Sequence, residues 1–216
     1  MTQPDSRRPL ASRDTAWARA LTRRLAATSI TPNQISWAGI GFALLAGLAF
    51  WGAGCSSGVL RGLMLILAAA GCQLRLICNL LDGLVAIEAG KHEADGAFWN
   101  EFPDRISDIL ILVGLGLGLG LPSLGWAAAT GAVLTAYTRE LGRATGLPAD
   151  FRGPMAKPQR MAVLTGAALL SVFAPLWDGR DGLLILGLWA VAIGTAVTVG
   201  LRGWRIVGAL KARVEV

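Results

Sequence analysis

Five blocks of this sequence carry almost no charge, and each is close to the length of a helix that crosses a lipid bilayer. The blocks are residues 25–60, 62–81 with Arg75 as the single charge, 109–138, 161–177 and 182–201. A bilayer core is crossed by about 20 apolar helical residues. Because 54% of the 216 residues are hydrophobic and only 16% are charged, the chain is too apolar for a soluble domain. The blocks therefore predict an all-α integral membrane protein.

Six transmembrane helices fit these blocks when residues 109–138 fold as two helices with a tight turn at Leu121, Pro122 and Ser123. The predicted spans are roughly residues 33–52, 61–87, 97–120, 123–146, 158–177 and 182–203. They predict one multi-pass, six-helix membrane domain over residues 31–210.

A polar segment precedes the first predicted span. Residues 1–12 are predicted to be a disordered tail. In residues 13–30, Trp17, Leu21 and Leu25 recur every four residues while the arginines lie elsewhere around the helix. This pattern predicts a short amphipathic helix lying in the membrane interface. The alternative is an ordinary charged lead-in to the first span.

The first span has a clear start signal. Thr31 can cap a helix, Pro32 suits the first helical position, and Gln34 can complete a capping box. The partial positive charge of that helix terminus would then lie at the same membrane face as the acidic stretch described below.

Lysine and arginine gather at one end of the predicted spans. They precede the first span, flank the second and fourth connections and follow the last span, whereas the opposite end keeps only Arg61 and Arg180. The positive-inside bias predicts that both termini and the second connection face the cytoplasm. If the chain is bacterial, the predicted location is the inner membrane. The net charge of +6 then favours anionic lipid and phosphate as partners. Nucleic acid is not expected, because no basic run alternates with aromatic residues.

The second connection and its flanks are unusually acidic. Residues 79–108 contain seven of the fourteen acidic residues, and they lie between two strongly apolar segments. Ionisable groups near membrane depth are costly unless they are paired, hydrated or bound to a metal, so this stretch is the predicted functional site.

Polar and small residues share a face at the end of the second span. Asn79, Asp82, Gly83 and Ala86 lie three, four and seven residues apart, which places them on one side of a helix. Gly83 and Ala86 have no side chain or a very small one on this face, so a bulky ligand could approach the backbone beside the oxygen-bearing side chains of Asn79 and Asp82.

A second polar face begins the third span. Asn100, Asp104 and Asp108 follow at four-residue intervals, and the two aspartates need a cation or an arginine because like charges at that spacing repel. Arg105 is predicted to pair with Glu101, four residues earlier.

Oxygen atoms from two such faces suit Mg²⁺, Mn²⁺ or Ca²⁺. Zinc is a poor fit because His92 is the only histidine.

Residues 79–104 follow the pattern N-x2-D-G-x2-A-I-x8-G-x3-N-x3-D. This pattern resembles the signature of the CDP-alcohol phosphotransferases, which is D-x2-D-G-x2-A-R-x8-G-x3-D-x3-D. Every spacing agrees, and three positions depart from the signature: Asn79, Ile87 and Asn100. The residues that agree are Asp82, Gly83, Ala86, Gly96 and Asp104. The helix start at Thr31, an arginine at the end of the fourth span and the segment 153–160, G-P-M-A-K-P-Q-R, also resemble the family.

The resemblance implies transfer of a substituted phosphoryl group from a CDP-linked donor, such as CDP-diacylglycerol, to an alcohol acceptor. CMP is released, and the reaction serves phospholipid biosynthesis. It also implies Mg²⁺ or Mn²⁺ as the cofactor, membrane lipids as surroundings and a homodimer. The identity of the acceptor alcohol stays open.

The resemblance further assigns roles to individual residues. Asp104 corresponds to the proposed general base. The implied metal ligands are Asn79, Asp82, Asn100 and Asp104. The implied nucleotide-binding residues are Asp82, Gly83, Ala86 and Gly96. The candidates for contacts with an acceptor phosphate are Arg139, Lys157 and Arg160, with ordinary positive-inside loop charges as the alternative.

The three departures leave other functions open. Asparagine at positions 79 and 100 removes two negative charges, so metal affinity should fall and either one or two ions could bind. Ile87 removes a phosphate or carboxylate partner, which Lys91, Arg105 or Arg75 could replace. A catalytically impaired relative that binds CDP-lipid or metal without turnover is therefore the alternative hypothesis. An unrelated transporter would instead predict an inverted repeat, and no convincing internal repeat is present.

Overall fold

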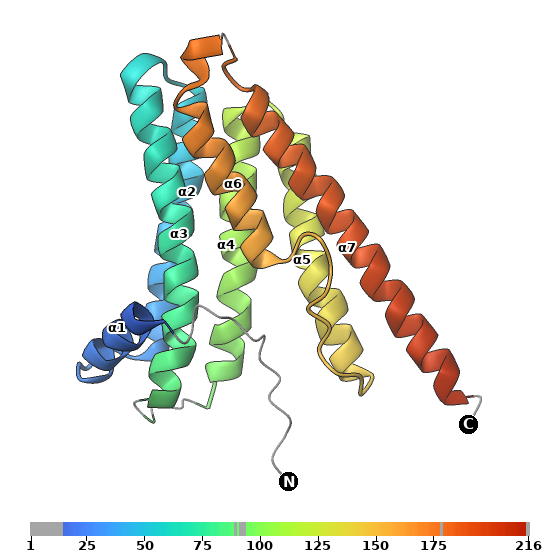
Figure 1. Cartoon of the computed structure of the whole chain (residues 1–216). Coiled ribbons are helices and arrows are strands. Elements are labelled where there is room, and N and C mark those ends of the chain that lie inside the picture. Colours follow the sequence, from blue (N-terminus) through green and yellow to red (C-terminus); the bar gives the residue numbers. More distant parts are fainter. Residues whose placement is uncertain (1–14, 89, 91–93, 178, 215–216) are drawn as a thin grey trace.

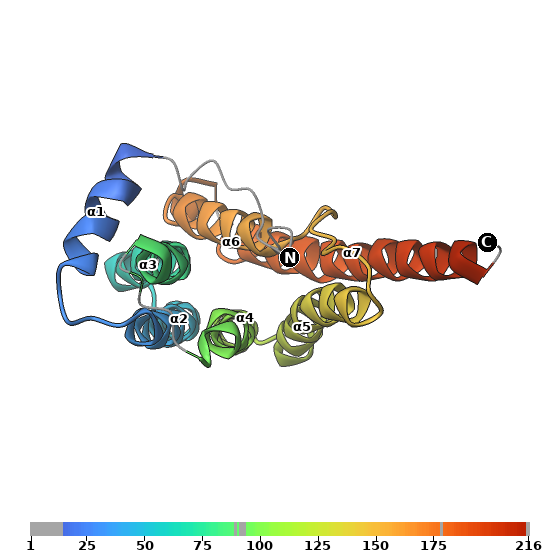
Figure 2. The same cartoon turned by 90° about the horizontal axis from the view of Figure 1, so that it is seen from below.

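The computed structural model describes residues 15–88, 90, 94–177 and 179–214, and every regular element within these ranges is helical. The elements are α1 (Ala16–Ala26), α2 (Pro32–Gly54), α3 (Gly58–Glu88), α4 (Gly96–Gly118), α5 (Pro122–Ala144), α6 (Lys157–Ser171), the 3-10 helix η2 (Ala174–Trp177) and α7 (Gly182–Val214). Helices α2 to α7 run up and down in turn, and α6 starts partway along the bundle (Figure 1). Seen from below, α2, α4 and α5 form one layer and α3, α6 and α7 the other, with α1 outside α3 (Figure 2).

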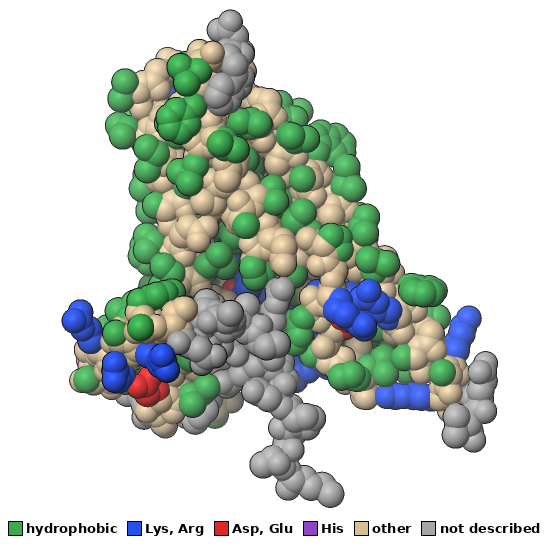
Figure 3. Space-filling view, in the orientation of Figure 1, with side chains coloured by type: hydrophobic (Ala, Val, Ile, Leu, Met, Phe, Trp, Pro, Cys, Tyr) green, Lys and Arg blue, Asp and Glu red, His purple; other side chains and the backbone are tan. Residues whose placement is uncertain are grey.

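Three of these helices, α2, α3 and α7, are long and apolar enough to cross a membrane. Hydrophobic side chains cover the upper part of the face in Figure 3, while lysine and arginine gather at the lower end. The prediction of an all-helical membrane protein is confirmed. The number of spans stays a prediction, because α4, α5 and α6 do not meet the same measure of length and hydropathy.

The predicted spans match the helices closely except for the last two. The fifth was predicted to continue to residue 177, but α6 ends at Ser171 and a turn leads into η2. Pro175 lacks the N–H that a continuing helix would use. The sixth was predicted to end at residue 203, but α7 continues to Val214 because the basic, polar sequence after the apolar block is still compatible with a helix.

The N-terminal amphipathic helix is shorter than predicted. Helix α1 covers residues 16–26 of the predicted 13–30 and ends where the Thr28 hydroxyl donates a hydrogen bond to the carbonyl of Leu25 (2.7 Å). Leu21 and Leu25 pack against the buried cluster that includes Val85, whereas Trp17 is 48% exposed. The predicted disordered tail, residues 1–12, lies outside the described residues.

The start signal of α2 is confirmed. The backbone N–H of Gln34 donates to the Thr31 hydroxyl (3.3 Å), and the Gln34 side-chain oxygen accepts from the Thr31 N–H (3.1 Å). This reciprocal pair satisfies two of the N–H groups that a helix start leaves without helical partners.

Arginines also secure the end of the bundle opposite the acidic stretch. Arg61 is 7% exposed and pairs with Asp181 at 2.9 Å, while its guanidinium donates to the carbonyls of Ala53 and Arg180. Arg180 in turn donates to the carbonyls of Gly54 and of Ser56. The two basic residues that the charge pattern leaves at this end therefore tie α2 and α3 to the start of α7.

Glycines let α2 and α4 approach closely. A Cβ atom on Gly47 would overlap the carbonyl oxygen of Leu110, and one on Gly114 would overlap the carbonyl of Gly47. Small residues at such crossings are typical of membrane helices, where close backbone packing drives association.

Gly47→Ala is therefore expected to push α2 from α4 and to lower the free energy of unfolding by about 1–3 kcal/mol, the usual cost of overpacking. Gly41→Ala in the same helix is the control, because a Cβ there meets nothing within 4 Å. Thermal unfolding in detergent measures both. A Gly47→Ala protein as stable as Gly41→Ala would contradict the close contact.

Candidate active site

A small pocket opens where α2, α3 and α4 meet. It is lined by Ser36, Gly39, Arg75, Asn79, Asp82, Pro103, Asp104 and Ser107. The structure thus brings the two predicted polar faces together, with Asn79 and Asp82 from α3 opposite Asp104 from α4. Asn100 does not join them, because it is exposed and is not among the lining residues.

Asp82 is a buried carboxylate with neutral partners. It is 5% exposed, and it accepts hydrogen bonds from the Ser36 hydroxyl (2.8 Å) and the Gly83 N–H (2.6 Å). Within the described ranges no lysine or arginine lies at ion-pair distance from it, whereas the other two buried aspartates are both paired. A buried charge is costly without a partner charge, so a cation from outside the chain would stabilise the ionised form of Asp82.

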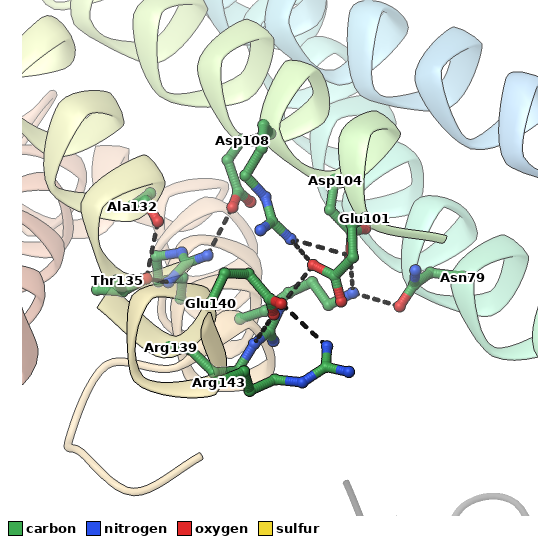
Figure 4. Close-up of polar contacts among 12 residues, drawn as sticks. Asn79, Glu101, Asp104, Asp108, Ala132, Thr135, Arg139, Glu140 and Arg143 are labelled. Carbon is green, nitrogen blue, oxygen red and sulfur yellow. Dashed lines mark hydrogen bonds and ion pairs between the residues drawn. The ribbon is translucent and has the colours of Figure 1, made fainter. Parts of the chain in front are cut away.

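Asp104 is surrounded by cations. Its Oδ1 atom lies 3.2 Å from Arg75, and its Oδ2 atom lies 3.6 Å from Arg105 and accepts a hydrogen bond from the ammonium of Lys157. The same ammonium donates to the side-chain oxygen of Asn79, so it bridges α3 and α4 (Figure 4).

Asp108 lies one helical turn deeper, between two buried arginines. Arg75 donates to it at 3.3 Å, and Arg160 donates from the other side at 2.5 Å. Arg160 also reaches the carbonyl of Met155 (3.0 Å). The prediction that Asp104 and Asp108 need a cation or an arginine is confirmed.

Arg75, one of the three basic residues that could replace the arginine missing at position 87, lines this pocket. It is 1% exposed, and its Nε and Nη1 atoms have no hydrogen-bond partner among the described residues. Its signal in the sequence was its position as the single charge in an apolar block of twenty residues, 62–81.

A second set of ion pairs lies nearer the surface. Arg105 pairs with Glu101 at 3.0 Å, as predicted. Arg139 donates hydrogen bonds to both Glu101 and Glu140 (Figure 4). Arg143 completes the set at 2.9 Å from Glu140. The three predicted acceptor-binding cations therefore have different carboxylate partners: Arg139 has the two glutamates, Lys157 has Asp104, and Arg160 has Asp108.

The face of α3 that carries Gly83 and Ala86 is open. A Cβ atom on Gly83 would meet nothing within 4 Å, and Ala86 is half-buried. The same holds for a Cβ atom on Gly96, at the start of α4. Ile87, at the position of the missing arginine, is 52% exposed. The predicted solvent-facing His92 lies outside the described residues.

Asp95 connects the starts of α2 and α4 beside this open face. The Trp99 indole donates to its carboxylate at 2.8 Å and the Asn33 amide at 3.2 Å. These two hydrogen bonds, with that of Trp99 the larger cause, hold the pKa of Asp95 below its ordinary value. The contact fixes the start of α4 against the capped start of α2.

The pocket has hard oxygen donors and one carboxylate without a cation. These features fit a single Mg²⁺ or Mn²⁺ ion at Asp82, with the Ser36 hydroxyl and a substrate phosphate beside it. A larger all-carboxylate cage is not present in the described residues, where no three His, Cys, Asp or Glu side chains converge as metal ligands.

Comparison with known proteins agrees with this picture of a helical membrane protein. No family model matches the chain. The fold is that of phosphatidylinositol phosphate synthase from Mycobacterium tuberculosis, solved with CDP-DAG bound: the TM-score is 0.73 at 21% identity, over 89% of this chain and 94% of that one. The same protein in complex with manganese and citrate gives a TM-score of 0.72 at 21% identity, over 88% of both chains.

Curated relatives point the same way. The chain is 27% identical over 134 residues to a phosphatidylinositol phosphate synthase from Streptomyces avermitilis and 29% identical over 100 residues to an archaetidylinositol phosphate synthase from Aeropyrum pernix. These matches cover 58% and 46% of this chain and span about half of each relative, 55% and 52%. The inner membrane protein YnbA of Escherichia coli is 28% identical over 76% of this chain and 77% of its own length. The resemblance to the CDP-alcohol phosphotransferase family is thereby confirmed.

Proposed function

We propose that this protein transfers a substituted phosphoryl group from a CDP-linked lipid donor to an alcohol acceptor and releases CMP. The observation that carries the proposal is the shared pocket of Asp82 and Asp104, in which Asp82 has no ion-pair partner among the described residues. Further support comes from the fold, which resembles a protein solved with CDP-DAG bound.

Bound Mg²⁺ or Mn²⁺ would supply Lewis-acid neutralisation of the donor pyrophosphate and of the leaving CMP. Asp82 is the carboxylate that would hold it, beside the Ser36 hydroxyl. The amide oxygen of Asn79 is bonded to Lys157 and Asn100 is exposed, so either asparagine would join only by turning its side chain toward Asp82. The open backbone at Gly83 and Gly96 would receive the cytidine side of the donor.

Asp104 is proposed as the general base that accepts the proton of the acceptor hydroxyl. An ionised carboxylate has about four lone-pair sites. The ammonium of Lys157 donates a hydrogen bond to one of them, while Arg75 and Arg105 lie at ion-pair distances of 3.2 and 3.6 Å. The cations keep the carboxylate ionised, and lone-pair sites are left for the hydroxyl at hydrogen-bond distance.

Arg75 is proposed to bind a donor phosphate in place of the arginine that Ile87 replaces. Arg75 lines the pocket, two of its buried guanidinium nitrogens have no hydrogen-bond partner among the described residues, and charge-assisted hydrogen bonds to phosphate suit a guanidinium fork.

Arg75→Lys keeps the positive charge but removes the fork. Its KM for the CDP-linked donor is expected to rise about tenfold or more, because a hydrogen bond to a charged group contributes about 1.5–3 kcal/mol. Steady-state kinetics of donor and acceptor separate the effects, with Arg143→Lys as control because that arginine pairs with Glu140 near the surface. An unchanged donor KM for Arg75→Lys would remove Arg75 from the donor site.

The six spans, the homodimer and the cytoplasmic location of both termini and of the pocket remain part of the proposal. Support for the orientation comes from the lysine and arginine residues gathered at the pocket end of the bundle (Figure 3).

A protein that binds CDP-lipid without turnover is the second candidate. The observation that favours it is Asn79, whose neutral oxygen is already bonded to Lys157 where the family signature has a metal-binding aspartate.

Release of CMP tests the two candidates. Purified protein receives CDP-diacylglycerol, Mg²⁺ or Mn²⁺, and a panel of acceptors that starts with inositol phosphate, since the named synthases point to it. We expect CMP release that depends on the acceptor and the metal and is lost in Asp104→Asn. Tight, metal-dependent binding of the donor with no CMP from any acceptor would instead establish the second candidate.

A further inference from the structure

From a fourth helix, Lys157 contacts two of the residues that line the pocket. It is the first residue of α6, and Pro158 follows it in the first turn of that helix. Its side chain is 24% exposed, and its ammonium contacts Asn79 and Asp104 together. In the signature that the chain resembles, an aspartate stands at each of these two positions. A cation of the protein itself therefore lies where two facing carboxylates would be expected to share a metal ion.

The charges around the pocket are already nearly balanced without metal. The three buried carboxylates Asp82, Asp104 and Asp108 face the cations Lys157, Arg75 and Arg160, and Arg105 approaches Asp104 while it also pairs with Glu101. All four of these cations contact Asp104 or Asp108.

The two ends of the pocket therefore differ. At the Asp82 end the described residues offer hydroxyl and backbone N–H partners but no ion pair, so a dication gains a full carboxylate charge. At the other end a dication would have to displace the Lys157 ammonium. Its ligands there would be the neutral amide oxygen of Asn79 and the carboxylate of Asp104, which Arg75 also binds. Repulsion from the remaining cations opposes that exchange.

We propose that this protein binds one dication, at Asp82, and that the Lys157 ammonium takes the place of a second dication between Asn79 and Asp104. The inference rests on the proposed function and specifies how its pocket is charged. The ammonium would then neutralise the phosphoryl oxygens on its side, a task that two-metal phosphoryl-transfer sites give to a second ion.

The number of bound Mn²⁺ ions tests the proposal on the full-length protein in detergent. Equilibrium binding counts the ions, and electron paramagnetic resonance reports their spacing, because two Mn²⁺ ions about 3.5–4 Å apart couple magnetically. We expect one ion per chain with the spectrum of an isolated ion. Two ions per chain, or a coupled spectrum, would overturn the proposal without any variant.

A variant set tests the role of the lysine. Asn79→Asp and Asn100→Asp are combined with Lys157→Met, and this triple variant is expected to bind two ions with a coupled spectrum. The matched control combines the same asparagine changes with Lys211→Met, an exposed lysine near the end of α7, and is expected to bind one ion. A second ion in the control, or only one in the Lys157→Met variant, would show that Lys157 does not exclude it. Retained binding at Asp82 shows that each variant is folded.

Different results would overturn the role of Lys157 and the proposed function. Wild-type protein that binds two Mn²⁺ ions and releases CMP would overturn the role of Lys157 and leave the proposed function standing. Protein that binds no Mn²⁺ and releases no CMP would overturn both.

Discussion

Asp82→Asn is expected to abolish Mn²⁺ binding and to lower CMP release at least about a thousandfold. Neutralisation of the pyrophosphate by metal contributes several kcal/mol to the transition state, and each 1.36 kcal/mol or so changes the rate tenfold. Asp82 is the buried carboxylate that has no ion pair among the described residues. Asp104 and Asp108 are already paired with lysine or arginine, so neither is expected to replace Asp82 as the metal ligand. Calorimetric Mn²⁺ titration and the CMP assay measure the two effects.

The same variant separates function from folding. Asparagine at position 82 removes a buried charge held by the Ser36 hydroxyl and the Gly83 N–H, so the metal-free protein is expected to be at least as stable as wild type. The rise in Tm that Mn²⁺ gives the wild type should disappear. Asp150→Asn is the control, since that carboxylate pairs with Arg152 and Arg205 away from the pocket. Mn²⁺-dependent activity that survives Asp82→Asn would remove Asp82 as the ligand.

Asp108→Asn is expected to have the largest effect on stability. It would leave Arg75 and Arg160, 1% and 3% exposed, without the carboxylate that both share. Breaking a buried ion pair by removing one partner costs about 3–5 kcal/mol. Thermal unfolding in detergent should show a large drop in Tm.

Glu140→Gln provides the matched comparison. Glu140 also bonds two arginines, Arg139 and Arg143, but its side chain is 40% exposed. Exposed pairs contribute about 0–1 kcal/mol, so its Tm should change little. Equal losses for the two variants would contradict the view that burial makes the Asp108 network important for the fold.

Local features of this protein could be predicted from the sequence. The capping box at Thr31 and the pairing of Arg105 with Glu101 depend on residues three or four positions apart, so helical geometry fixes both. The meeting of Asp82 with Asp104 was also predictable, because a short acidic connection joins two apolar helices whose polar faces end and begin beside it. Helix periodicity places those faces.

Contacts between distant segments could not be predicted. Lys157 reaches Asp104 across 53 positions of sequence, and it does so because α6 starts partway along the bundle (Figure 1). The sequence predicted Lys157 and Arg160 as contacts of an acceptor phosphate, with ordinary loop charges as the alternative. Neither hypothesis included the packing of α6 against α3 or the burial of Arg160 against Asp108. Asn100 was predicted to face the pocket but is exposed. Its direction depends on how α4 is rotated about its axis, which a four-residue repeat does not fix.

The most direct test is a structure of the protein with Mn²⁺ and a CDP-linked donor, with anomalous scattering recorded at the manganese edge. One anomalous peak is expected, within coordination distance of the Asp82 carboxylate and of a donor phosphate, with Lys157 still between Asn79 and Asp104. A donor bound with its phosphates away from Asp82, or manganese located elsewhere in the protein, would contradict the account.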